Sequence, residues 1–120
     1  GMACADLLNK SGHLVTLYEK DEFGGGLLRY GIPDFKLAKF VVERRLGFMR
    51  EEGVNIITNT EVGKDIAVEM IMNDYDAVCI AIGSQQPRDL KVEGRNLKGI
   101  HFAGLPHSTE QGKLWKKHTC

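Results

Sequence analysis

The residues of this chain with the clearest chemical potential are one acid, Glu19, and a run of three glycines at 24–26. Glu19 ends a short apolar run, residues 14–18, that is rich in β-forming side chains. A carboxylate at the end of a strand can accept hydrogen bonds from both hydroxyls of a ribose, and bare glycine backbone lets a ligand lie close to the chain. The pattern therefore indicates a dinucleotide site.

The segment before Glu19 predicts half of a βαβ dinucleotide-binding unit. Residues 1–9 are small and apolar, which favours a helix packed tightly on a sheet and ended by Gly12. Glu19 lies 18 residues after Gly1, close to the roughly 20 expected between a glycine fingerprint and its ribose acid. Gly1 is thus expected to be the last glycine of that fingerprint, with an ordinary terminal residue as the alternative. The first strand and glycine turn are expected to be missing.

Strands and helices are expected to alternate along the rest of the chain, which predicts an α/β layer fold. The expected elements are a helix at 37–53, a strand at 54–58, a helix at 66–72 with Asp65 as N-cap, a central buried strand at 76–82 and a last strand at 99–103. The apolar side of the first of these helices is expected to hold Leu37, Phe40, Val41, Phe48 and Met49.

Composition narrows the class of protein. The 120 residues suffice for one domain, and 16 basic against 16 acidic side chains give no reason to expect nucleic acid or membrane partners. No apolar run approaches the ~20 residues that span a bilayer, and the expected location is cytoplasmic.

The three cysteines, Cys4, Cys79 and Cys120, are far apart, which argues against a disulfide framework, a zinc site or an iron–sulfur cluster. Cys4 and Cys79 are expected to be small buried hydrophobes.

No Ser/His/Asp set, metal cluster or pair of carboxylates is discernible, so no residue is predicted to be catalytic. Gly83 closes the apolar run at 76–82, at the strand end where α/β sheets bind ligands. It is therefore a further candidate for close approach to a cofactor.

Two long stretches resemble a known family. They read YEKDEFGGGLLRYGIPDFKLAKFVVERRLGFMREEGVNIITNTEVGKD and YDAVCIAIGSQQPRDLKVEGRNLKGIHFA. Over about residues 1–103 the chain resembles the small (beta) chain of NADPH-dependent glutamate synthase and related FAD- and NADPH-binding modules. The ordered motifs GGLL, YGIP, RR and EGV make this resemblance specific.

The resemblance implies a partial Rossmann-like, FAD/NAD(P)-binding domain. In the family, hydride passes from NADPH to FAD, and electrons leave through iron–sulfur clusters to the large chain, where glutamate is made. NADPH and the clusters would be bound outside this segment. By position, the resemblance assigns the adenosine ribose to Glu19 and other cofactor contacts to Gly25, Gly26, Leu27, Lys36, Val62 and Gly83. Ile82 replaces the family's usual threonine and so lacks its hydroxyl.

The resemblance stops after Ala103, which predicts two parts: a partial FAD-binding domain at 1–103 and a divergent or out-of-frame tail at 104–120. One set of codons for residues 104–112, shifted by one base, reads D-F-L-T-Q-Q-N-K, which is close to the expected continuation of the family. The fragment is expected to be inactive alone.

Two other functions stay open. The chain could be the FAD/NADPH electron-transfer module of another oxidoreductase in the same group, because its motifs position a cofactor without choosing a substrate. It could also be a non-catalytic α/β protein that binds an adenine nucleotide or acts in protein interactions.

Overall fold

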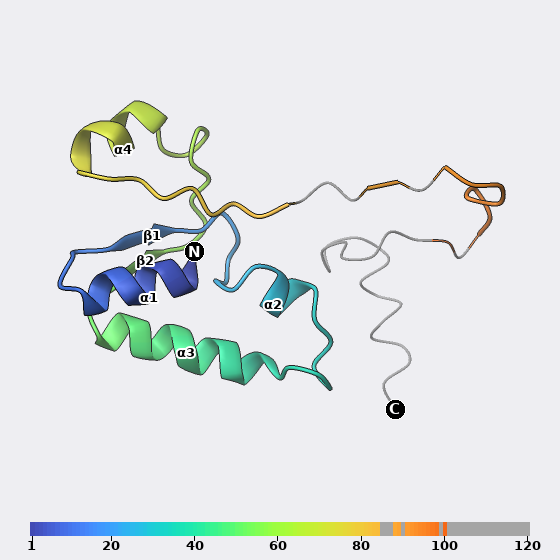
Figure 1. The fold of residues 1–120 in the computed structure, drawn as a ribbon, viewed down its shortest axis with the longest axis horizontal. Helices are drawn as coiled ribbons and strands as arrows, with labels where there is room; N and C mark the ends of the chain where they lie inside the picture. Colours follow the sequence, from blue (N-terminus) through green and yellow to red (C-terminus); the bar gives the residue numbers. More distant parts are fainter. Residues whose placement is uncertain (85–87, 90, 99, 101–120) are drawn as a thin grey trace. The chain divides into compact units, whose positions relative to one another are not determined.

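A computed structural model of the chain describes residues 1–84, 88–89, 91–98 and 100. The chain forms two compact units, residues 1–82 and 83–120. The first unit holds every helix and strand assigned in the described residues (Figure 1). None of these helices has the length and hydropathy needed to cross a bilayer.

The first unit is built on a small parallel sheet. Strand β1 (Thr16–Tyr18) pairs with strand β2 (Asn55–Ile57), with Leu17 opposite Ile56. The crossover between them carries helices α2 (Leu27–Tyr30) and α3 (Lys39–Glu51). A parallel pair joined by a helical crossover is the βαβ unit, so the predicted α/β fold is confirmed.

Two helices cover one face of this sheet, as Figure 1 shows for α1 (Met2–Lys10) and α3. The core between helices and sheet consists of Ala5, Met49 and Val54, with Met2, Val15, Leu17 and Ile56 packed against it. Helix α1 ends at Lys10 with Ser11 as its C-cap, and Gly12 has φ +92°, the left-handed conformation that suits glycine after a helix. The predicted end of this helix is confirmed.

Helix α3 buries a different face from the one predicted. Its buried residues are Val42, Leu46 and Met49, whereas Phe40 and Phe48 are exposed, Phe40 by 67%. The glycine loop explains the difference, because it lies against this face. A Cβ built on Gly24 would stand 3.2 Å from Leu46 Cδ1. Only Met49 of the predicted apolar side is fully buried; Leu37 and Val41 are half-buried.

The predicted central strand at 76–82 is wrong. These residues form no strand and are all exposed, with Ile80 and Ile82 exposed by 79% and 80%. The apolar composition is that of a buried strand, but a strand also needs a hydrogen-bonded neighbour. In the described part of the chain, the sheet contains β1 and β2 alone.

The helix expected at 66–72 begins later than predicted. Helix α4 spans Val68–Asp74, and its N-cap is Ala67 instead of Asp65. The Asp65 carboxylate accepts a hydrogen bond from the Glu61 backbone N–H at 2.8 Å, which closes a turn before the helix. A short polar side chain that caps a local turn is not available to cap the helix that follows.

In the second unit, the described residues form a turn around Gly94, which has φ +82°. Arg95 Nε donates to Asp89 Oδ1 at 2.6 Å, and the Leu97 N–H donates to the Gly94 carbonyl at 3.0 Å. Of the strand expected at 99–103, only residue 100 is described, and the tail expected at 104–120 lies outside the described residues.

Candidate functional site

The backbone of Glu19 is fixed at the carboxyl end of the sheet. Its N–H donates to the Ile57 carbonyl at 2.9 Å, which continues the β1–β2 pairing by one residue. Its own carbonyl accepts from Thr60 N–H at 3.0 Å, and the Asp21 carbonyl accepts from Asn59 N–H at 3.1 Å. These bonds join the loops that follow the two strands, at the sheet edge where α/β proteins bind ligands.

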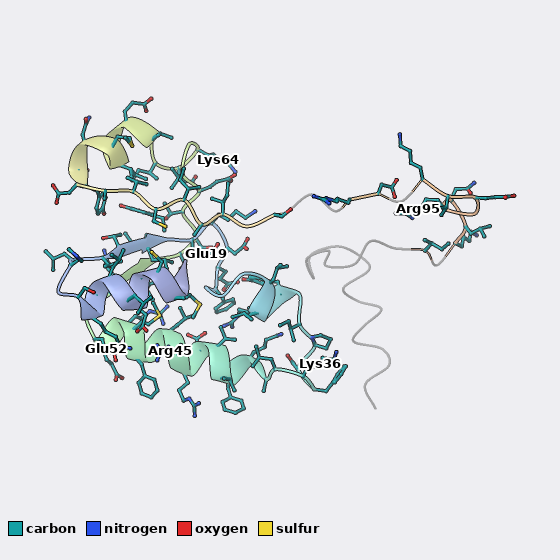
Figure 2. The ribbon with its side chains drawn as sticks, viewed as in Figure 1. Glu19, Lys36, Arg45, Glu52, Lys64 and Arg95 are labelled. Atoms are coloured by element: carbon teal, nitrogen blue, oxygen red, sulfur yellow. The ribbon has the colours of Figure 1, made fainter. Side chains whose placement is uncertain are left out.

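The Glu19 side chain is half-buried and partly oriented. Its Oε1 accepts a hydrogen bond from the Asp21 backbone N–H at 3.2 Å. A carboxylate has two oxygens and about four acceptor positions, so this bond leaves capacity for ribose hydroxyls. Figure 2 shows Glu19 beside the sheet in the first unit.

A pair of tyrosines joins β1 to the end of α4. The hydroxyls of Tyr18 and Tyr75 lie 3.1 Å apart, and their rings meet edge to face at 6.3 Å. The hydrogen bond with Tyr75, and then burial, raise the pKa of Tyr18 above its usual 10.0. The contact fixes the start of residues 76–82 beside β1, the strand that directly precedes Glu19.

The glycine loop after Glu19 packs on α3. Gly25 has φ +120°, and a Cβ there would stand only 2.7 Å from Val42 Cγ1, so no other residue fits without displacement. Gly26 has φ +50°, and a Cβ there would meet nothing within 4 Å. The backbone of Gly26 is therefore open to a neighbouring molecule, whereas the absence of a side chain at Gly25 is explained by packing within the protein.

Helix α2 is held on α3 by Arg29, whose role the sequence did not reveal. Its guanidinium lies 4.0 Å from the Phe23 ring centroid, and its NH1 pairs with Glu43 Oε2 at 2.7 Å. A cation over an aromatic face, paired with a carboxylate, fixes the path of the glycine loop between them. The signal in the sequence was the arginine directly after the GGLL motif, eight residues before the helix predicted at 37–53.

The cation predicted near the cofactor, Lys36, is exposed and lies in the loop between α2 and α3 (Figure 2). It is well separated from Glu19 in this view. In the same region the protein holds Lys39, whose Nζ donates to the Ile32 carbonyl and lies 3.4 Å from Asp34 Oδ1. Lys39 thus stabilises the turn at 31–33.

The other predicted contacts are distributed along the chain. Val62 is 44% exposed in the loop after β2, where Gly63 N–H donates to the Ile66 carbonyl at 2.8 Å. Gly1 is the N-cap of α1, and a Cβ there would lie 3.7 Å from Ala81 Cβ and 3.8 Å from Leu17 Cδ1. Leu27 is 61% exposed at the start of α2.

Gly83 has φ +67° and belongs to the second unit, so the site is described from the first unit alone. Within the described ranges, no group of three His, Cys, Asp or Glu side chains is placed to hold a metal ion. What the first unit offers is a partly oriented carboxylate on a fixed backbone, followed by the open backbone of Gly26.

No family model matches the chain. Individual relatives do match. The NADH glutamate synthase of Saccharomyces cerevisiae is 52% identical over 103 residues, which is 86% of this chain and 5% of the yeast protein. The NADPH glutamate synthase small chains of Bacillus subtilis and Mycobacterium tuberculosis are 48% and 46% identical over the same share of this chain and 21% of their own length.

The chain therefore spans about a fifth of the small chains and a twentieth of the NADH enzyme. Identity near one half over 103 residues is far more than a shared glycine motif would give. The resemblance inferred from the sequence is confirmed, and the chain matches one segment of the glutamate synthase small chain.

Proposed function

We propose that this chain forms part of the Rossmann-like FAD-binding domain of a glutamate synthase small chain. The observation that carries the proposal is the position of Glu19, a half-buried acid held by main-chain hydrogen bonds at the carboxyl edge of a parallel sheet. Dinucleotide-binding folds place their ribose-binding acid at this edge. The names of the relatives support the assignment of this domain to a glutamate synthase.

The residues present fit the adenosine end of FAD. The Glu19 carboxylate accepts hydrogen bonds, which two ribose hydroxyls can donate. The open backbone at Gly26 lets a bulky group approach the loop. The set that we assign to the cofactor in the first unit is Gly1, Glu19, Gly25, Gly26, Leu27, Lys36 and Val62.

In this proposal the chain's own residues bind and orient FAD, and the hydride chemistry belongs to the flavin. When bound, FAD supplies the acceptor for hydride from NADPH. In the whole subunit, we assign NADPH and the iron–sulfur clusters to other segments, because the chain spans 21% of the small chains. The electrons would then reach the large chain for glutamate synthesis, in the cytoplasm.

Neither alternative is favoured. The module of another oxidoreductase, and a non-catalytic nucleotide-binding or interaction protein, both fit the acid and the glycines equally well. However, the three relatives described above are all named glutamate synthases, at 46–52% identity.

The proposal is tested by titrating the purified chain with FAD and following flavin fluorescence. We expect saturable binding that ADP competes away and FMN does not, because Glu19 contacts the adenosine half. Glu19→Ala should weaken binding roughly 10- to 100-fold, since hydrogen bonds to a charged group contribute about 1.5–3 kcal/mol. The matched control is Glu22→Ala, which removes the same charge from an exposed position in the same loop.

Binding that Glu19→Ala leaves unchanged would contradict the assignment of the ribose to Glu19. Competition by FMN as strong as by ADP would contradict binding through the adenosine end. A circular dichroism spectrum of each variant checks that the fold is retained.

A further inference from the structure

Two cysteines that the sequence placed apart meet in the first unit. Cys4, in the first turn of α1, and Cys79, in the segment 76–82, have their Sγ atoms 3.7 Å apart. Both were predicted to be small buried hydrophobes, and that prediction is wrong. Cys4 is half-buried and Cys79 is exposed. Both thiols are free, and reagents in solution can reach at least one of them.

Two other contacts fix the same juxtaposition. The Tyr18 and Tyr75 hydroxyls lie 3.1 Å apart, just before the segment, and Ala81 lies beside Gly1 near its end. The segment therefore runs past the start of α1 with Cys79 between two points of contact. These two contacts hold the backbone on both sides of Cys79 near β1 and the start of α1, where Cys4 lies.

We propose that Cys4 and Cys79 are a modification site, a dithiol that closes to a disulfide and links α1 covalently to residues 76–82. A disulfide has sulfurs about 2.05 Å apart, so closure requires an approach of less than roughly 2 Å. Residues 76–82 belong to no strand and are exposed, so no ladder of hydrogen bonds opposes that movement. This proposal is independent of flavin binding.

The oxidant we name is a low-molecular-weight disulfide such as oxidised glutathione. The Cys79 thiolate attacks one glutathione sulfur, which forms a mixed disulfide and releases one glutathione thiolate. The Cys4 thiolate then attacks Cys79 Sγ, which forms the protein disulfide and releases the second glutathione. Two electrons pass from the cysteines to glutathione, and the two cysteine protons end on the two released thiols.

The order of attack follows from exposure and hydrogen bonding. Cys79 is the more exposed thiol, so it meets the oxidant first. The Cys4 thiol donates to Cys79 Sγ, and this hydrogen bond, then burial, raise the pKa of Cys4 above its usual 9.0. Cys4 therefore stays protonated until Cys79 carries glutathione. It then acts as the resolving thiol, which attacks the mixed disulfide.

Closure would join residues 75 positions apart in the sequence. Cross-links that close long loops restrict the unfolded chain most, so the oxidised protein should melt roughly 10 °C or more above the reduced protein. The disulfide would add a covalent link to the single-point contacts that hold the segment 76–82 beside α1 and β1.

The test uses the full chain with Cys120→Ser, so that Cys4 and Cys79 are its only thiols. The reduced protein is incubated with oxidised glutathione, under native conditions and in guanidinium. We expect a native product lighter by two hydrogens, in which tryptic peptides 1–10 and 65–88 are joined. Joining should be at least tenfold faster under native conditions, because the fold raises the effective concentration of the second thiol.

Two single-cysteine controls carry Cys4→Ser or Cys79→Ser in the same background. Each should retain one bound glutathione, because no second thiol displaces it. Stable glutathione on both cysteines of the parent, with no joined peptides, would overturn the proposal. Joining no faster in the native chain than in guanidinium would also overturn it, because the fold would then contribute nothing.

Discussion

Two parts of the first unit contain apolar residues and differ in whether they bury them. The layer of α1, α3 and the sheet buries the side chains at its centre, with Leu46 and Met49 0% exposed. Six of the seven residues at 76–82 are apolar, yet all seven are exposed, Ile80 by 79%. The layer is connected by main-chain pairing of β1 with β2 and by side-chain contacts between helices, whereas the segment has contacts at single points, Tyr75, Cys79 and Ala81.

Apolar composition therefore makes a segment able to bury its side chains, whereas hydrogen-bonded neighbours determine whether burial occurs. An extended backbone must pair its N–H and C=O groups or leave them to water. In the described residues, 76–82 has no ladder partner, so its backbone stays solvated and its side chains stay exposed with it.

The largest expected effect comes from removing a side chain of the layer. Met49→Ala should destabilise the chain by about 3 kcal/mol, because a fully buried methionine leaves a cavity that the core only partly fills. Ile80→Ala, the matched change in the segment, should alter stability by less than about 0.5 kcal/mol. Urea unfolding followed by circular dichroism measures both. Equal losses would show that the segment is as buried as the layer.

The next effect concerns the glycine loop that lies on α3. Gly25→Ala should cost about 2 kcal/mol, because φ is +120° and the new Cβ would stand 2.7 Å from Val42 Cγ1. Gly47→Ala is the control: this residue is inside α3 with nothing within 4 Å, and the change should stabilise by about 0.5 kcal/mol. Urea unfolding followed by circular dichroism measures the change in stability of both variants. A neutral Gly25→Ala would mean that the loop does not rest on Val42.

The smallest effect is electrostatic and depends on pH. Asp6 Oδ2 lies 3.0 Å from Lys10 Nζ and 2.7 Å from Arg45 NH2, which ties α1 to α3. The hydrogen bond from Lys10, and after it the charge of Arg45, lower the pKa of the Asp6 carboxyl below its usual 3.8. The folded-state pKa is depressed, so this stabilisation is present above pH 3.8 and is lost as pH falls through the folded-state value.

Asp6→Asn should therefore lower the melting temperature by a few degrees at pH 7, with the difference from the parent shrinking as the pH falls below 3.8. Asp76→Asn, in the exposed segment, serves as the control and should shift the melting temperature little at any pH. Melting temperatures from pH 7 down to pH 2 supply the measurement. If the difference in melting temperature between the parent and Asp6→Asn persisted at pH 2, the effect of Asp6 would come from packing instead of charge.

The sequence predicted the parts of the fold that local signals determine. Gly12 and Gly53 follow α1 and α3 with φ +92° and +104°, as helix-ending glycines do, and the two short strands lie within the predicted ranges. The position of Glu19 at a strand end was also predictable, because the β-forming run before it is short and ends at the acid.

What the sequence could not predict depends on contacts between distant residues. Helix α3 has two apolar stripes, one with Phe40 and Phe48 and one with Val42, Leu46 and Met49; the glycine loop selects the second. Lys36 and Lys39 are alike in sequence, and only the folded turn shows that Lys39 is the one held by backbone carbonyls. Burial of 76–82 likewise depends on pairing, which composition does not encode.

The main-chain bonds around Glu19 have a consequence for how this site can change. Because the Ile57 carbonyl and Thr60 N–H hold the backbone there, the fold places few demands on the side chain at this position. Under the proposal that Glu19 binds a ribose, exchange of the acid for another residue should alter ligand preference and leave the architecture intact. An arginine there would favour a phosphorylated ribose over a free one, so position 19 is suited to evolution or redesign of specificity.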